Sequence, residues 1–237
     1  MSENKIDGPS KKRAGMDAAI IDLYLEKYPE KWGSAVPHLD AIGRGIRNRK
    51  PMYGTREEIY EIVSWKRGPT GAKFYDENSE DDVRKTTEKA LAKEKVAEKV
   101  EILAELNQVS TAMASAILRF VNPSEFGTVD WRNWYVLSQP TNTHNENNVL
   151  FNKGLLKALD NLYSSVEITS NLYMVYLTVI RELATKFPKR TEKGKQLRII
   201  KEIINEYPHR TPAEIDMAIF SYSWEFLPEK DKRGLRG

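Results

Sequence analysis

Apolar side chains recur along most of this chain at the three- and four-residue spacing of an α-helix. Near the C-terminus the spacing runs through Ile215, Ile219, Tyr222 and Phe226, which places these side chains on one helix face. Alternating runs of β-branched and aromatic residues, which are typical of strands, are scarce. The sequence therefore predicts an all-α protein.

Residues that are typical of helix caps and of loops divide this pattern into segments. Thr55 precedes Glu58 by three residues, and Thr211 precedes Glu214 by three, the capping-box spacing at a helix start. Loops are predicted over 65–78, which contains Gly-Pro, and over the Asn/Thr-rich residues 139–148. Polar residues 1–14 predict a flexible arm, and 15–237 a single domain. Helices are expected at 16–28, 36–48, 55–66, 80–93, 95–107, 110–121, 131–138, 148–163, 170–186, 194–206 and 212–226.

The composition excludes several classes of function. The chain has no cysteine, which removes disulfide scaffolds, thiol nucleophiles and cysteine-ligated metals. Its three histidines do not form a zinc-binding pattern, so no metal and no cofactor are expected. The most apolar window, Ala112–Val121, is far shorter than the ~20 residues of a membrane span. The basic N-terminus lacks the apolar core of a signal peptide, so a cytoplasmic location and no membrane partner are expected.

Charge and nucleotide motifs are equally uninformative about a partner. The 37 basic and 34 acidic residues leave a net charge of +3, short of the strong cationic bias of many nucleic-acid-binding domains. Gly43-Arg44-Gly45 lacks the third glycine of a dinucleotide fingerprint, and residues 68–73 lack the P-loop spacing. Nucleotide-binding α/β folds are therefore disfavoured.

Residues 106–130 carry the most specific pattern. A helix is expected to end near Asn107, a tight hairpin to follow over 106–112, and Ser110 to cap the next helix. Small residues in that second helix permit close packing against its neighbours. The segment, followed by Val129-Asp130, resembles the hairpin of the helix-hairpin-helix DNA glycosylase superfamily of the endonuclease III type. Aligning the hairpin brings Val129-Asp130 onto the family's catalytic Val-Asp without a gap.

A weaker similarity covers residues 55–226 and points to an uncharacterised, divergent microbial branch of that superfamily. It rests on Ser64-Trp65-Lys66, on Asp216 and on Tyr222-Ser223. The resemblance implies a bilobal helical fold with Asp130 in a cleft. It also implies that Asp130 stabilises an oxocarbenium-like sugar and orients a water molecule.

The resemblance further implies DNA-contacting residues. Trp131, Trp134 and Tyr135 follow the carboxylate directly and could stack on an extruded base, or could fill the core instead. Asp130 could equally be only the N-cap of the next helix. The DNA contacts implied by the alignment are Gln108, Ser110, Thr111, Trp131 and Arg132.

The chain also departs from the family pattern. Gln108 and Ser110 replace the two hairpin glycines that approach a DNA phosphate, so the hairpin could be only a helix–helix turn. Ala112 replaces the lysine that forms a Schiff base in bifunctional members, so a lysine-dependent lyase is not expected. Basic clusters that could meet phosphates, or simply be solvated, are Lys11–Arg13 and Arg44, Arg47, Arg49 and Lys50.

These observations support a DNA-binding protein that is a candidate monofunctional N-glycosylase. Two alternatives stay open: a non-catalytic nucleic-acid- or nucleoprotein-binding module on the same fold, and a helical protein–protein adaptor. Whether the protein is an enzyme, which lesion it would act on, DNA versus RNA, and the oligomeric state are left open by the sequence.

Overall fold

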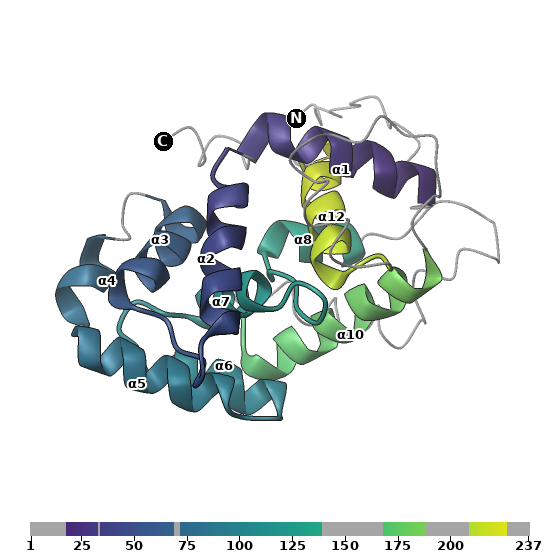
Figure 1. The fold of residues 1–237 in the computed structure, drawn as a ribbon. Coiled ribbons are helices and arrows are strands. Elements are labelled where there is room, and N and C mark those ends of the chain that lie inside the picture. The colour runs from purple at the N-terminus through teal and green to yellow at the C-terminus, as the bar shows by residue number, and fades with distance from the viewer. Residues whose placement is uncertain (1–17, 33, 69–71, 139–167, 188–208, 227–237) are drawn as a thin grey trace, which may run out of the picture.

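The computed structural model describes residues 18–32, 34–68, 72–138, 168–187 and 209–226 (Figure 1). Every regular element within these ranges is a helix, which confirms the predicted all-α class. The helices are α1 (Ala18–Trp32), α2 (Val36–Asn48), α3 (Arg56–Arg67), α4 (Ala72–Glu77), α5 (Glu80–Leu91), α6 (Val96–Leu103), α7 (Thr111–Val121), α8 (Trp131–Ser138), α10 (Ser170–Lys186) and α12 (Pro212–Phe226).

Four helices have the predicted bounds, namely α2, α8, α10 and α12. The start of α3 confirms its capping box, since Thr55 Oγ1 accepts the Glu58 amide while Glu58 Oε2 accepts the Thr55 amide. Thr211 and Glu214 make the same reciprocal bonds. The arm at 1–14, the loop at 139–148, and the helices expected at 148–163 and 194–206 lie outside the described residues.

The prediction of a loop over 65–78 is wrong. Helix α3 continues to Arg67, and α4 occupies Ala72–Glu77. The Phe74 side chain of α4 is fully buried, and Asn78 ends the helix by donating from Nδ2 to the carbonyls of Phe74 and Asn107. Gly68 still ends α3, whereas tertiary contacts of Phe74 and Asn78 make the residues from Ala72 onward helical.

Helix α7 lies at the centre of the described structure (Figure 1) and packs against α2, α3, α6 and α10. Helix α12 packs against α1, α8 and α10. The buried apolar side chains form one contiguous cluster. This arrangement brings the end of α3 to the start of α8, and it brings α8 and the segment after α7 against α12. Among the described residues, no helix is long and apolar enough to cross a membrane.

Candidate functional site

Asp130 stands at the point where the segment after α7 turns into α8. Its Oδ1 accepts the backbone N–H of Arg132 at 3.0 Å, so Asp130 is the N-cap of α8. The side chain is only 10% exposed. Capping and burial are both compatible with a chemical role, because an N-cap carboxylate still presents a negative charge.

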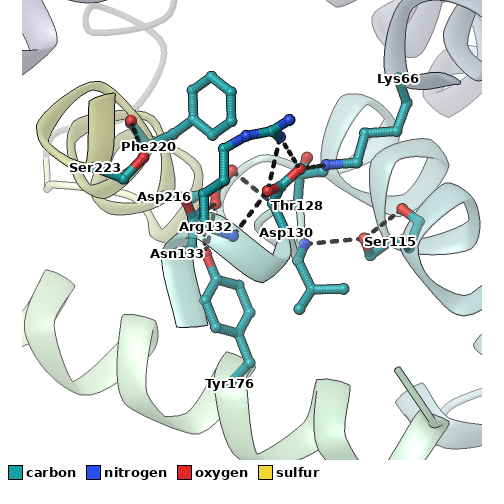
Figure 2. A network of polar contacts seen from close by, with 12 residues as sticks. Lys66, Ser115, Thr128, Asp130, Arg132, Asn133, Tyr176, Asp216, Phe220 and Ser223 are labelled. Atoms are coloured by element: carbon teal, nitrogen blue, oxygen red, sulfur yellow. Dashed lines mark hydrogen bonds and ion pairs between the residues drawn. The ribbon is translucent and has the colours of Figure 1, made fainter. Parts of the chain in front are cut away.

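Two cations flank this carboxylate (Figure 2). Lys66, from the last turn of α3, donates from Nζ to Oδ2 at 2.8 Å. Arg132 donates from Nη1 to Oδ1 at 2.9 Å and to Oδ2 at 3.0 Å. The three side chains form a buried ionic triad, which we call the Asp130 triad.

The triad keeps Asp130 ionised. Burial acts to raise the pKa of Asp130, but the charges of Lys66 and Arg132 and the hydrogen bonds they make act more strongly, so the pKa lies below its ordinary value. Asp130 is therefore a carboxylate at neutral pH despite its burial. A fixed negative charge of this kind can stabilise a positive charge that develops beside it.

Aromatic rings surround the guanidinium group of Arg132. Its Cζ lies 4.9 Å from the ring centre of Trp131, 5.6 Å from that of Phe220 and 5.9 Å from that of Trp224. Trp131 is 41% exposed, so of the two alternatives for this residue, filling the core is excluded. The side chains of Trp134 and Tyr135 lie outside the described part of the structure.

A second buried carboxylate, Asp216 on α12, lies beside the triad (Figure 2). Its Oδ1 accepts Tyr176 Oη–H and Asn133 Nδ2–H, each at 2.5 Å. Its Oδ2 accepts the Thr128 backbone N–H at 3.0 Å. Asp216, which the resemblance placed in a family element, is thus joined to residues on both sides of Asp130.

Burial raises the pKa of Asp216 from 3.8 to about 6, although the hydrogen bonds from Tyr176 and Thr128 act in the opposite direction. Because the folded state then binds this proton more tightly than the unfolded chain, the contribution of Asp216 to stability falls as the pH rises through this range. As the pH rises from 5 to 7, we expect the free energy of unfolding of the wild-type protein to fall by about 1 kcal/mol relative to that of the variant Asp216→Asn.

Urea titrations of both proteins across that range measure this difference. At each pH, subtracting the free energy of unfolding of the variant from that of the wild type removes the contributions of the other titrating groups. A difference that does not change with pH would show that Asp216 keeps its ordinary ionisation in the folded state.

The hairpin of residues 106–112 joins the site through α3. Gln108 has a φ of 67°, so the position aligned with a family glycine keeps a left-handed backbone without glycine. Arg67 donates to the Gln108 carbonyl and to its Oε1, while Gln108 Nε2 donates to Glu77. Consecutive residues of α3 thus reach two places: Lys66 contacts Asp130 and Arg67 contacts the hairpin.

The other hairpin residues differ from expectation in one respect. Ser110 occupies the N-cap position of α7, but its side chain makes no capping hydrogen bond, so the predicted cap is wrong. Ser110 is exposed and Thr111 half-buried. Both hydroxyls lie at the start of α7, whereas the Gln108 side chain is already bonded within the protein.

Helix α7 also supports the segment that carries Asp130. Ser115 Oγ accepts the Val129 backbone N–H at 3.0 Å and donates to the Ala112 carbonyl at 2.7 Å. The small side chain lets the segment approach the helix closely. Ser115 was expected only as a packing residue, and its hydroxyl adds a specific bond next to Asp130.

The basic cluster in and after α2 is partly used inside the protein. Arg47 donates to the Val121 carbonyl, and Arg49 forms two hydrogen bonds with the Glu58 carboxylate. Lys50 is exposed. Lys11–Arg13 lie outside the described residues. Two arginines of this cluster therefore have structural roles.

Comparison with known proteins adds no relative: no family model, no curated protein and no solved structure matches the chain. Within the described residues, no group of three or more His, Asp or Glu side chains is placed to hold a metal ion. The interpretation of the site therefore depends on its own geometry.

Sequence reasoning missed two features of this site. Lys66 appeared only as part of a Ser-Trp-Lys element, and its contact with Asp130 spans 64 residues of chain. Asn133 carried no signal beyond being a polar residue one turn into α8. A lysine in the last turn of a helix is ordinarily solvated, so its spacing alone does not reveal a buried partner.

Proposed function

We propose that this protein is a DNA-binding, monofunctional N-glycosylase on a bilobal helix-hairpin-helix fold, acting in the cytoplasm, with Asp130 as the catalytic carboxylate. The observation that carries the proposal is the Asp130 triad: a buried, ionised carboxylate at the start of α8, one helix beyond the hairpin. The resemblance of residues 106–130 supports the same assignment.

The reaction needs a negative charge beside the sugar. As the bond between C1′ and the base breaks, electrons leave with the base and C1′ becomes positive. Asp130 would stabilise that charge, and water would then add to C1′ while one of its protons passes to the departing base, which is released as a neutral molecule. The product is a free base and an abasic sugar, with the DNA strand intact.

Access to Asp130 depends on Lys66. A carboxylate offers about four acceptor positions, and four contacts from Lys66 and Arg132 use them. The Lys66 ammonium group therefore occupies a place where a sugar cation would be stabilised. We expect substrate binding to displace Lys66 while Arg132 keeps Asp130 in position.

The same observation favours the second candidate, a non-catalytic module that binds nucleic acid on this fold. In that case the triad is a structural ion cluster that fixes α3 to α8. Exposed Trp131 and the hydroxyls of Ser110 and Thr111 would still be available for a nucleic acid.

Base release from duplex oligonucleotides that carry oxidised, deaminated, alkylated or mismatched bases tests the proposal. We expect release that becomes visible as strand cleavage only after alkali, and we expect Asp130→Asn to reduce it at least 100-fold, since carboxylate catalysis contributes ~10²–10⁴-fold. The matched control is Asp40→Asn, because the Asp40 side chain is 9% exposed and is also paired with an arginine.

Each other result has a distinct meaning. Equal release by wild type and Asp130→Asn would contradict the catalytic assignment. Strand cleavage without alkali would contradict the monofunctional assignment and direct attention to Lys66. Steeply salt-dependent binding without release on any base would support the non-catalytic module, and salt-insensitive or undetectable binding would favour a protein–protein adaptor.

A further inference from the structure

The segment that carries Asp130 is attached to α12 through Asp216. Thr128, two residues before Asp130, donates its backbone N–H to Asp216 Oδ2. Asn133, three residues after Asp130, donates its amide to Asp216 Oδ1. One carboxylate on α12 therefore holds both sides of the turn whose centre is Asp130 (Figure 2).

The surroundings leave this carboxylate little freedom. Tyr176 on α10 donates to the same Oδ1, and the neighbouring Tyr173 hydroxyl donates to the Gly127 carbonyl at 3.0 Å. A Cβ atom on Gly127 would lie 2.4 Å from Ile180 Cδ1 and 3.1 Å from Asp216 Cβ. The segment thus packs directly on Asp216, and a small movement of either one is transmitted to the other.

We propose that Asp216 is a positioning residue for Asp130, and that the uptake of one proton by Asp216 moves Asp130 out of its place between Lys66 and Arg132. The ionised Asp216 accepts three hydrogen bonds. A protonated Asp216 carries an O–H in place of one acceptor position and is a weaker acceptor at the others, so the bonds from its three donors must rearrange or weaken.

Two rearrangements follow from where the proton binds. On Oδ2 it removes the bond to the Thr128 amide. A proton on Oδ1 would face the N–H of the Asn133 side-chain amide, so that two donors would meet. Rotation of the amide would instead turn Asn133 Oδ1 toward this proton as an acceptor. Asn133 Oδ1 is a buried atom with no hydrogen-bond partner among the described residues. The first change releases the Thr128 side of the turn that holds Asp130, and the second moves its Asn133 side because one hydrogen bond to Asp216 is exchanged for another.

The tyrosines around this cluster and Asp130 do not change protonation near neutral pH. Burial raises the pKa of the Tyr28, Tyr173 and Tyr176 hydroxyls, so these phenols stay neutral. The pKa of Asp130 is lowered, so it stays ionised. Asp216 is thus the group that changes charge. The groups that face the cluster are Tyr28 (α1), Asp40 (α2), Lys66 (α3), Arg119 (α7), Asp130 and Arg132 (start of α8), and Tyr173 and Tyr176 (α10).

Two backbone amides test the coupling directly. The Thr128 amide is bonded to Asp216 and the Arg132 amide to Asp130. In ¹H–¹⁵N spectra of the whole protein we expect both signals to shift between pH 5 and pH 7 with one shared midpoint near 6. A Thr128 signal that titrates while Arg132 does not would overturn the proposal. The absence of a transition at Thr128 would overturn it as well.

Variants assign the transition. Tyr176→Phe removes a bond to the ionised carboxylate, so we expect the shared midpoint to move to higher pH for both amides. Asp216→Asn should abolish both transitions, and Asp40→Asn should leave them in place. If Asp216→Asn does not fold, the wild-type titration and Tyr176→Phe still decide the matter.

The consequence for activity depends on the proposed glycosylase function. We expect base release to fall about tenfold for each pH unit below the midpoint, and the fall to move with the midpoint in Tyr176→Phe. Release without this pH dependence would refute the positioning role. If the amides titrate together but no base is released, the coupling stands and only the proposed function fails.

Discussion

Replacement of Gly43 by alanine is expected to lower the free energy of unfolding by about 3 kcal/mol and the Tm by ~6–12 °C. Gly43 is a point of close contact between α2 and α7, since an added Cβ would lie 1.9 Å from the Phe120 carbonyl oxygen and 2.3 Å from its carbon. These are backbone atoms of a buried helix and cannot rotate away. The two helices must separate, and the packing around them is lost.

The same helix provides the control. Gly45, two residues further on, has no atom within 4 Å of an added Cβ. Gly45→Ala should therefore raise stability by ~0.5–1 kcal/mol, because alanine loses less backbone entropy in a helix. Opposite signs at the two positions, measured by chemical denaturation, would establish the close contact. A stable Gly43→Ala protein would mean that α2 and α7 lie further apart.

The prediction of secondary structure succeeded where the signal was local. The stripe through Ile215, Ile219 and Tyr222 is buried on α12, and the reciprocal bonds of Thr55 and Glu58 form as expected. Periodicity and capping depend on neighbours within one or two turns. Helix α4 was missed because its burial depends on Asn78, whose bonds to Asn107 join residues far apart in the sequence.

The residues of the candidate site also differ in whether the local sequence predicts their roles. Asp130 and Arg132 are close in sequence, and the capping role of Asp130 could be predicted from the following helix. The partners that give Asp130 its properties could not be predicted, since Lys66 comes from α3 and Asp216 from α12. Nothing in the local sequence determines which lysine reaches which carboxylate, because that depends on how the helices pack.

Arg119 shows a signal that was visible but not interpreted. It is the one charged residue in the apolar window Ala112–Val121, and a charge on a buried face needs a partner. The structure identifies that partner as Asp40 on α2, 79 residues away. Arg119 also donates from Nη2 to Met217 Sδ at 3.2 Å, so one side chain connects α2, α7 and α12.

Replacement of Arg119 by methionine is expected to cost ~3–5 kcal/mol, the largest loss among these variants. The Arg119 side chain is 2% exposed and the Asp40 side chain 9%, so the remaining carboxylate can reach little water. The charge of Asp40 would stay buried without the guanidinium group of Arg119, which pairs with it in the wild-type protein. The loss should appear as a lower denaturation midpoint with an unchanged slope, measured with urea at pH 7.

Two comparisons separate this electrostatic cost from lost packing. In the double variant Arg119→Met/Asp40→Asn the buried negative charge is removed as well, so we expect it to recover at least half of the loss. Lys85→Met, which breaks the fully exposed pair with Asp81, should leave stability unchanged within error. If the double variant were as unstable as Arg119→Met alone, the arginine would act through its packing between α7 and α12, and the Asp40 charge would not matter. Since Gly43 and Asp40 both lie on α2 where it meets α7, recovery in the double variant would also show that this helix contact survives without its ion pair.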